Sequence, residues 1–177
     1  MQHAFTTRYQ ERMNVLYTET GVCIPMLKND NTNPDIKNYI AIWDTGATHS
    51  AITSKIAKEL NLKATGLVEV KHADGKSLTN TYLVNILLPN HVMVGQVKVT
   101  EVKLIKDDNI SEEKSPQILI GMDIIGIGDF AVTNLNNKTI LSFRIPSFEQ
   151  IDFVSRANIQ NEIERKKNRR IFRGKRK

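Results

Sequence analysis

The sequence is poor in cysteine, and its histidines are scattered. The single cysteine, Cys23, excludes an intrachain disulfide and fits a reducing compartment. The four histidines, His3, His49, His72 and His91, lie far apart and lack the paired spacing of metal ligands. We therefore expect no metal site and no cofactor.

Long apolar runs are also missing. The first residues, MQHAFTTRYQERM, are polar and lack the hydrophobic segment of a secretory signal. The most apolar stretch, Ile118 to Val132, is interrupted by Asp123 and Asp129 and is too short to span a bilayer. These absences predict a cytoplasmic protein without a membrane span.

Acidic residues are missing from the end of the chain. The segment from Arg165 to Lys177 carries nine Lys or Arg residues and no Asp or Glu. Without it, 16 basic residues face 19 acidic ones, so the net charge changes from +6 to −3. The basic character thus belongs to this tail, which could bind nucleic acid, an acidic protein or an anionic membrane surface. A solvated, disordered extension is the alternative.

The rest of the sequence is typical of one mostly β domain. A chain of 177 residues is long enough for one domain with a sizeable core. Short segments rich in Val, Ile, Leu and Thr alternate with turn residues, and Asp74-Gly75 is a strong hairpin signal. We predict strands at 39–43, 68–72, 78–88, 92–104, 118–120, 130–133 and 139–143, two strands within 14–26 that turn at Thr20-Gly21, and polar loops at 29–35 and 106–116.

Three segments have helical character. Residues 53–60 place Ile56, Ala57 and Leu60 on one face, with Thr53 as the expected N-cap. Residues 123–128 could form one helical turn. After Phe148, apolar residues recur at helical spacing until the basic tail begins. We therefore divide the chain into an N-terminal extension (1–13), a domain (14–147) and a helical, basic C-terminal tail (148–177).

The most informative segment is IAIWDTGATHSAIT, residues 40–53. Its apolar strand leads directly into Asp44, so the carboxylate follows a rigid core element. Gly46 allows the backbone to approach that carboxylate and turn tightly. Ala47 is small enough for a second loop to pack against it. An Asp-Thr-Gly triplet alone is a weak signal, because a strand that ends in a polar turn has the same composition.

Two further features follow in order. A glycine-containing hairpin is predicted at His72–Lys76, and the apolar segment Ile118–Gly121 comes about 75 residues after Asp44. Together with the Asp-Thr-Gly loop, they resemble the retropepsin-like (retroviral-type) aspartic proteases, most closely the bacterial single-domain branch. The resemblance covers Val15 to Pro146. Thr48 replaces an acid found in many viral enzymes, and Gly121-Met122-Asp123 replaces the viral Gly-Arg-Asn or Gly-Arg-Asp.

This resemblance implies an all-β fold with one or two short helices, a half-barrel with one lobe per chain that forms a two-fold dimer. It implies that Asp44 is catalytic, that the next four residues build the active-site loop, that a flap lies over it, and that an apolar strand supports it. The corresponding residues are Thr45, Gly46, Ala47 and Thr48 in the loop, Ala73, Asp74 and Gly75 in the flap, and Ile120 and Gly121 in the supporting strand.

Aspartic proteolysis needs two carboxylates, and the chain has one Asp-Thr-Gly loop. Asp123 is expected to be an N-cap or an ion-pair partner instead. The second carboxylate should therefore be Asp44 of another copy. We predict an aspartic endopeptidase that acts as a homodimer on a peptide or protein substrate through activated water. The alternative is a catalytically silent dimerisation module with a polyanion-binding tail. Trp43 and Cys23 are expected in the core, and His49 on the surface.

Overall fold

The computed structural model describes residues 1–25, 34–72, 75–104 and 115–174, which form two compact units, Met1–Ser147 and Phe148–Lys177. Most of both predicted polar loops lies outside these residues. The elements are β1 (His3–Arg8), β2 (Leu16–Cys23), β3 (Lys37–Trp43), β4 (Ala51–Thr53), α1 (Ser54–Glu59), β5 (Gly66–His72), β6 (Gly75–Leu87), β7 (Met93–Val102), β8 (Ile118–Ile120), α2 (Met122–Ile125), β9 (Asp129–Leu135), β10 (Lys138–Ile145) and α3 (Phe153–Gly174). The predicted mostly β class is confirmed.

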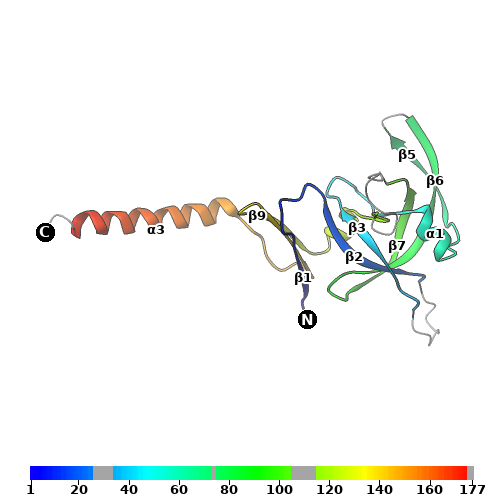
Figure 1. Ribbon diagram of the computed structural model, residues 1–177, viewed down its shortest axis with the longest axis horizontal. Coiled ribbons are helices and arrows are strands. Elements are labelled where there is room, and N and C mark those ends of the chain that lie inside the picture. Colours follow the sequence, from blue (N-terminus) through cyan, green and yellow to red (C-terminus); the bar gives the residue numbers. More distant parts are fainter. Residues whose placement is uncertain (26–33, 73–74, 105–114, 175–177) are drawn as a thin grey trace. The chain divides into compact units, whose positions relative to one another are not determined.

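The first unit is built on a seven-stranded sheet with the order β2-β3-β8-β4-β7-β6-β5. Figure 1 labels β2, β3, β7, β6 and β5 of this sheet. The last residues of β2 also pair with β6, so the sheet curls back on itself. Inside it, β3 pairs with β2 on one side in antiparallel fashion and with β8 on the other in parallel. The strand that precedes Asp44 is therefore an inner strand, held along both edges.

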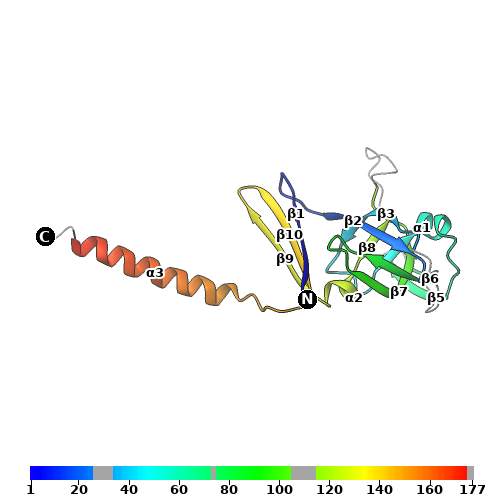
Figure 2. The ribbon, with the colours of Figure 1, turned by 90° about the horizontal axis from the view of Figure 1, so that it is seen from below.

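A second sheet contains three strands in the order β1-β10-β9 (Figure 2). The strands predicted at 130–133 and 139–143 form the β9–β10 hairpin. Its turn residues Asn136 and Asn137 both have positive φ, at 51° and 58°, as a two-residue hairpin turn requires. β1 lies within the segment assigned as an N-terminal extension, and it pairs with β10 over six residues. Residues 3–8 are thus part of the first compact unit.

The core of the first unit joins both sheets. Its fully buried side chains include Ile52, Val84, Ile118 and Phe143. Every second residue from Tyr82 to Leu88 is also buried, so one face of this segment belongs to the core. Cys23 is 1% exposed and Trp43 is 4% exposed, as expected for core residues.

The expected turn at Thr20-Gly21 is wrong, because β2 runs unbroken from Leu16 to Cys23. Gly21 serves close packing instead. A Cβ at this position would lie 2.6 Å from Cγ2 of Ile36 and 3.1 Å from Cβ of Leu87. Glycine inside a strand often marks such a close approach.

The two short helices occur where they were predicted. Thr53 is the N-cap residue of α1, but its side chain makes no capping hydrogen bond. Its hydroxyl donates to the side-chain carbonyl of Gln117, and its N–H donates to the main-chain carbonyl of the same residue. Thr53 therefore ties β4 to the residue before β8 rather than closing the helix end.

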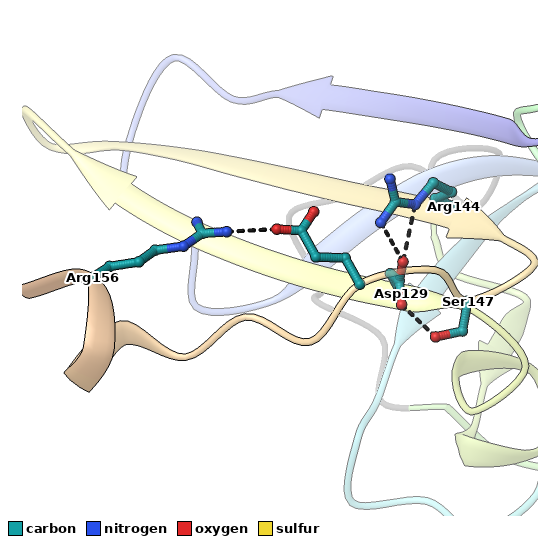
Figure 3. Close-up of polar contacts among 5 residues, drawn as sticks. Asp129, Arg144, Ser147 and Arg156 are labelled. Carbon is teal, nitrogen blue, oxygen red and sulfur yellow. Dashed lines mark hydrogen bonds and ion pairs between the residues drawn. The ribbon is translucent and has the colours of Figure 1, made fainter.

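The last residues of the first unit are fixed by Asp129, at the start of β9. Arg144 donates from Nε and Nη2 to one oxygen of this carboxylate, and the Ser147 hydroxyl donates to the other (Figure 3). The side chain of Asp129 thus joins β9, β10 and the segment that follows β10.

The second unit consists mainly of α3, which confirms the helix predicted from the apolar spacing after Phe148. Asp152 accepts the N–H groups of Val154 and Ser155 through Oδ1, at 2.9 and 3.2 Å. Arg156 pairs with Glu149 at 2.6 Å (Figure 3). Among the described residues, no helix has the length and apolar character needed to cross a membrane.

Candidate active site

Asp44 is positioned by the inner strands of the large sheet. It follows Trp43, the last residue of β3, and its N–H donates to the carbonyl of Ile120 at 2.9 Å. This bond extends the parallel pairing of β3 with β8 by one residue. The Asp44 side chain is half-buried. The carboxylate thus projects from a fixed main chain and keeps access to solvent.

The residues after Asp44 turn back on its carboxylate. The Gly46 N–H donates to Oδ1 of Asp44 at 2.8 Å, and the Ala47 N–H donates to the Asp44 carbonyl at 3.3 Å. A Cβ at Gly46 would lie 3.2 Å from Oδ1, which is tight. Thr45 and Thr48 are exposed. The exposed Thr45 side chain is therefore accessible to a loop of another protein molecule.

Gly121 lies directly beneath this loop. The next two N–H groups, of Met122 and Asp123, donate to the carbonyls of Ala47 and Thr48 at 2.8 and 3.2 Å. A Cβ at Gly121 would lie 2.6 Å from the carbonyl carbon of His49, closer than Cβ atoms approach backbone. Ile120 and Gly121 are thus in direct contact with the Asp44 loop. That they support catalysis stays a prediction.

Ser50 and Asp123 form a polar link that sequence reasoning did not assign to the site. The Ser50 hydroxyl donates to Asp123 Oδ1 at 2.7 Å and accepts the Gly121 N–H at 3.0 Å. The Ser50 N–H donates to Asp123 Oδ2 at 2.9 Å. Asp123 is not the N-cap that was expected, because Gly121 occupies that position of α2. The carboxylate instead holds the far end of the Asp44 loop. No local pattern in the sequence indicates this link, because its two residues lie 73 positions apart.

The side chain of Trp43 anchors the other end of the loop. Its indole N–H donates to the Thr18 hydroxyl at 2.8 Å. Its ring contacts Phe5, Phe130 and Phe143, with centroid distances of 5.7, 5.8 and 5.1 Å. These three rings come from the three strands of the smaller sheet. The smaller sheet therefore packs against the residue that immediately precedes Asp44.

A cavity of about 930 Å³ opens at Asp44. Its floor follows from the strand register, since Tyr17, Ile42 and Leu119 lie opposite one another on β2, β3 and β8 and so share one face. Phe130 and Val132 of β9 complete another wall. Apart from Asp44, no acidic residue lines this cavity in the described part of the chain.

The predicted flap is a hairpin of β5 and β6. His72 pairs with Gly75, as the Asp74-Gly75 signal predicts, and Lys76 forms an ion pair with Glu69 at 2.8 Å. Ala73 and Asp74 lie outside the described residues, and the flap role of all three residues, Gly75 included, stays a prediction. His49 is exposed, as expected for a surface histidine. Within the described ranges, no three His, Cys, Asp or Glu side chains gather as metal ligands would.

Comparison with known proteins agrees with this geometry. The family model described as gag-polyprotein putative aspartyl protease matches residues 35–126, just over half of the chain. The match includes β3, the Asp44 loop, the β5–β6 hairpin, β8 and α2. The chain therefore belongs to this family of aspartyl proteases, and its fold is of the retropepsin-like kind.

Among solved structures, the chain is similar to a retropepsin-like aspartic protease from Rickettsia conorii. The two share 14% sequence identity with a TM-score of 0.45, over 81% of this chain and 95% of the other. No curated protein shows significant similarity to the sequence.

Proposed function

We propose that the protein is an aspartic endopeptidase that hydrolyses peptide bonds as a homodimer, with Asp44 of each copy forming the catalytic pair. The observation that carries this proposal is the Asp44 carboxylate itself. It stands at the end of an inner strand, accepts the Gly46 N–H, and opens into a cavity large enough for substrate side chains.

The need for a second copy follows from the number of available carboxylates. Among the residues that the structure describes, Asp44 is the one acidic residue that lines the cavity. The carboxylate of Asp123 is engaged by Ser50 and by the Ile124 N–H. Aspartic proteolysis requires one carboxylate as base and one protonated carboxyl as acid. A two-fold axis beside the exposed Thr45 would supply the second group from an identical loop.

The proposed reaction needs no covalent intermediate. Two facing carboxyls cannot both ionise easily, so they share one proton. The ionised group takes a proton from a water held between them, and the water attacks the peptide carbonyl. The protonated group donates to the carbonyl oxygen, and the resulting tetrahedral species collapses with protonation of the leaving amine. Gly46 N–H holds Oδ1 of Asp44 in place throughout.

An aspartate-to-asparagine series tests the proposal. Asp44→Asn keeps the side-chain shape but removes the base from both halves of the pair, so cleavage of a peptide library should fall at least about 1,000-fold. Asp35→Asn, at an exposed site away from the loop, is the matched control and should keep the parent rate. Asp123→Asn should lower the free energy of unfolding by about 1–3 kcal/mol, because it loses acceptors for Ser50.

Circular dichroism and sedimentation should first establish that each variant folds and associates like the parent. If Asp44→Asn is folded, dimeric and still cleaves at a substantial fraction of the parent rate, the protease assignment is wrong. A pepstatin-type inhibitor distinguishes an active protease from the alternative, a catalytically silent module. It should raise the Tm of the parent and should leave the Tm of Asp44→Asn nearly unchanged.

A further inference from the structure

Among the described residues that line the cavity at Asp44, two carry a charge. One is Asp44 itself, and the other is Lys103, which directly follows β7. Most of the remaining lining is apolar and includes Ile42, Leu119 and Phe130. In a largely apolar site, a few polar or charged groups orient the ligand and decide which ligand binds. Lys103 is therefore the group of this lining that attracts a negatively charged ligand.

The main chain that carries Lys103 is held by neighbouring strands. The preceding residue, Val102, lies opposite Thr53 in the parallel pairing of β7 with β4. Thr53 binds Gln117 through its hydroxyl and its N–H, and the side-chain amide of Gln117 donates to the carbonyl of Ser115 at 3.1 Å. Ser115 also lines the cavity. Two parts of the cavity lining, at Lys103 and at Ser115, are thus connected through hydrogen-bonded residues.

The Lys103 side chain is available to a ligand. The residue is exposed, and within the described part of the chain it forms no ion pair with an Asp or Glu side chain. Asp44 is therefore not its partner, although both residues line the cavity. By contrast, Lys55 and Lys76 each pair with a glutamate, at 4.0 and 2.8 Å. A lysine side chain is flexible and strongly hydrated, so it can bind a carboxylate without a fixed geometry.

An extended peptide can use the apolar and the charged parts of this lining together. Its side chains alternate between two faces, so every second one lies on the same face, roughly 7 Å from the last. An apolar side chain against Ile42 and Leu119 thus leaves the next side chain of that face elsewhere in the same cavity. Lys103 attracts an acidic side chain at such a position and repels lysine or arginine.

We infer that Lys103 selects peptides in which an acidic side chain accompanies an apolar one near the bond to be cleaved. The inference rests on the proposed function and names its substrate class. A homodimer would present Lys103 from both copies, so the preference should appear on both sides of the scissile bond. The preference should weaken with added salt, because exposed charge pairs are screened.

The experiment uses a peptide set with one scissile bond between apolar residues, in which Glu, Gln or Lys occupies each neighbouring position in turn. Cleavage at about pH 6, where the glutamate side chain of a peptide is ionised, gives kcat/KM for every peptide at low and high salt. Reduced-bond versions of the same peptides cannot be cleaved, and fluorescence anisotropy measures their Kd.

Three variants are compared with the parent. Lys103→Glu reverses the charge in the cavity, and Lys103→Gln removes it. Lys98→Glu is the matched control, because Lys98 is exposed on the same strand, β7, and lies outside the described cavity lining. Circular dichroism checks that each variant folds.

The parent and Lys98→Glu should cleave the best Glu peptide at least about threefold faster than its Gln counterpart at low salt. Lys103→Gln should lose this preference, and Lys103→Glu should favour the Lys peptide instead. The Kd values should follow the same order.

A parent that cleaves without charge preference would overturn the inference and leave the proposed function standing. A preference that persists in both Lys103 variants, or that is lost equally in Lys98→Glu, would also overturn the inference. A parent that binds Glu peptides best through Lys103 but never cleaves would leave the inference on binding standing and would refute the proposed function alone. A parent that neither binds nor cleaves any peptide would overturn both.

Discussion

At the scale of single residues, the Asp44 loop depends on close approach between its own main chain and the main chain at Gly121. Gly46 lets the main chain lie close to the Asp44 carboxylate, and Gly121 lets β8 pass close to the backbone of the loop. The polar link between Ser50 and Asp123 fixes the loop at its far end, and Trp43 fixes the near end. The position of Asp44 thus depends on residues from β3, β8 and α2.

Gly121 provides the sharpest residue-scale prediction. Gly121→Ala should lower the free energy of unfolding by about 1–3 kcal/mol, because the new methyl group meets the main chain of His49 and Ala47, which cannot rotate away. Residual folded protein should also cleave poorly, since the Asp44 loop must move. Chemical denaturation and peptide cleavage measure the two effects.

Gly95→Ala is the matched control. Its Cβ would meet only Oδ1 of Asn85, at an ordinary contact distance of 3.6 Å. Comparable losses in both variants would mean that the loss of glycine flexibility, and not the contact beneath the loop, is responsible.

At the scale of elements, what could be predicted from the sequence was local. The apolar strand before Asp44, the hairpin at Asp74-Gly75 and the short helix after Thr53 each have a signal within a few residues. Gly21 was misleading because glycine is common both in turns and at sites of close packing, and one sequence does not separate the two.

The missed elements depend on distant partners. β1 pairs with β10, whose residues follow more than 130 positions later, and no pattern within HAFTTR indicates that partner. The aromatic contacts of Trp43 draw on the same distant strands. The link between Ser50 and Asp123 likewise joins residues 73 positions apart. The flap role of residues 73–75 and catalysis by a pair of Asp44 carboxylates stay predictions.

Two tyrosines should make the folded chain less stable as the pH rises in the alkaline range. Burial raises the pKa of Tyr39 and of Tyr82 above the ordinary value of 10.0, and hydrogen bonds to Glu59 and Glu101 raise each further. The folded chain therefore retains protons that the unfolded chain loses above about pH 10. Their contribution to stability is complete below that pH and should decline as the pH rises through the folded pKa values.

Urea unfolding between pH 8 and about pH 11 measures this decline. The double variant Tyr39→Phe with Tyr82→Phe should be less stable than the parent at pH 8 and should show a flatter pH dependence above about pH 10. A parent-like slope in that variant would assign the alkaline loss to other groups.

At the scale of the whole molecule, charge and proposed chemistry are carried by different units. The residues of α3 from Arg165 to Asn168 are exposed, and basic residues continue to the end of the chain. The first unit contains Asp44 and the cavity beside it. We therefore expect peptide cleavage and polyanion binding to be separable.

Deletion of residues 165–177 tests this separation. Cleavage of a short neutral peptide should stay close to the parent rate, while affinity for heparin or RNA should fall at least about tenfold at moderate salt, because nine cationic side chains are removed. Lys63→Gln, at an exposed site in the first unit, is the control for simple charge reduction. Polyanion affinity that survives the deletion would assign that binding to another surface.

The pairing of β1 with β10 also has a consequence for the order of events during synthesis. A growing chain emerges from its first residues onward, so β1 and Asp44 appear long before β8 and β10 exist. Strand pairs that close such long loops form late in folding. Until residues 118–145 have been made, Asp44 lacks its parallel neighbour and Trp43 lacks most of its aromatic contacts. If the proposed function is right, the topology delays proteolytic activity until nearly the whole first unit has left the ribosome, so an unfinished chain would not cleave its neighbours.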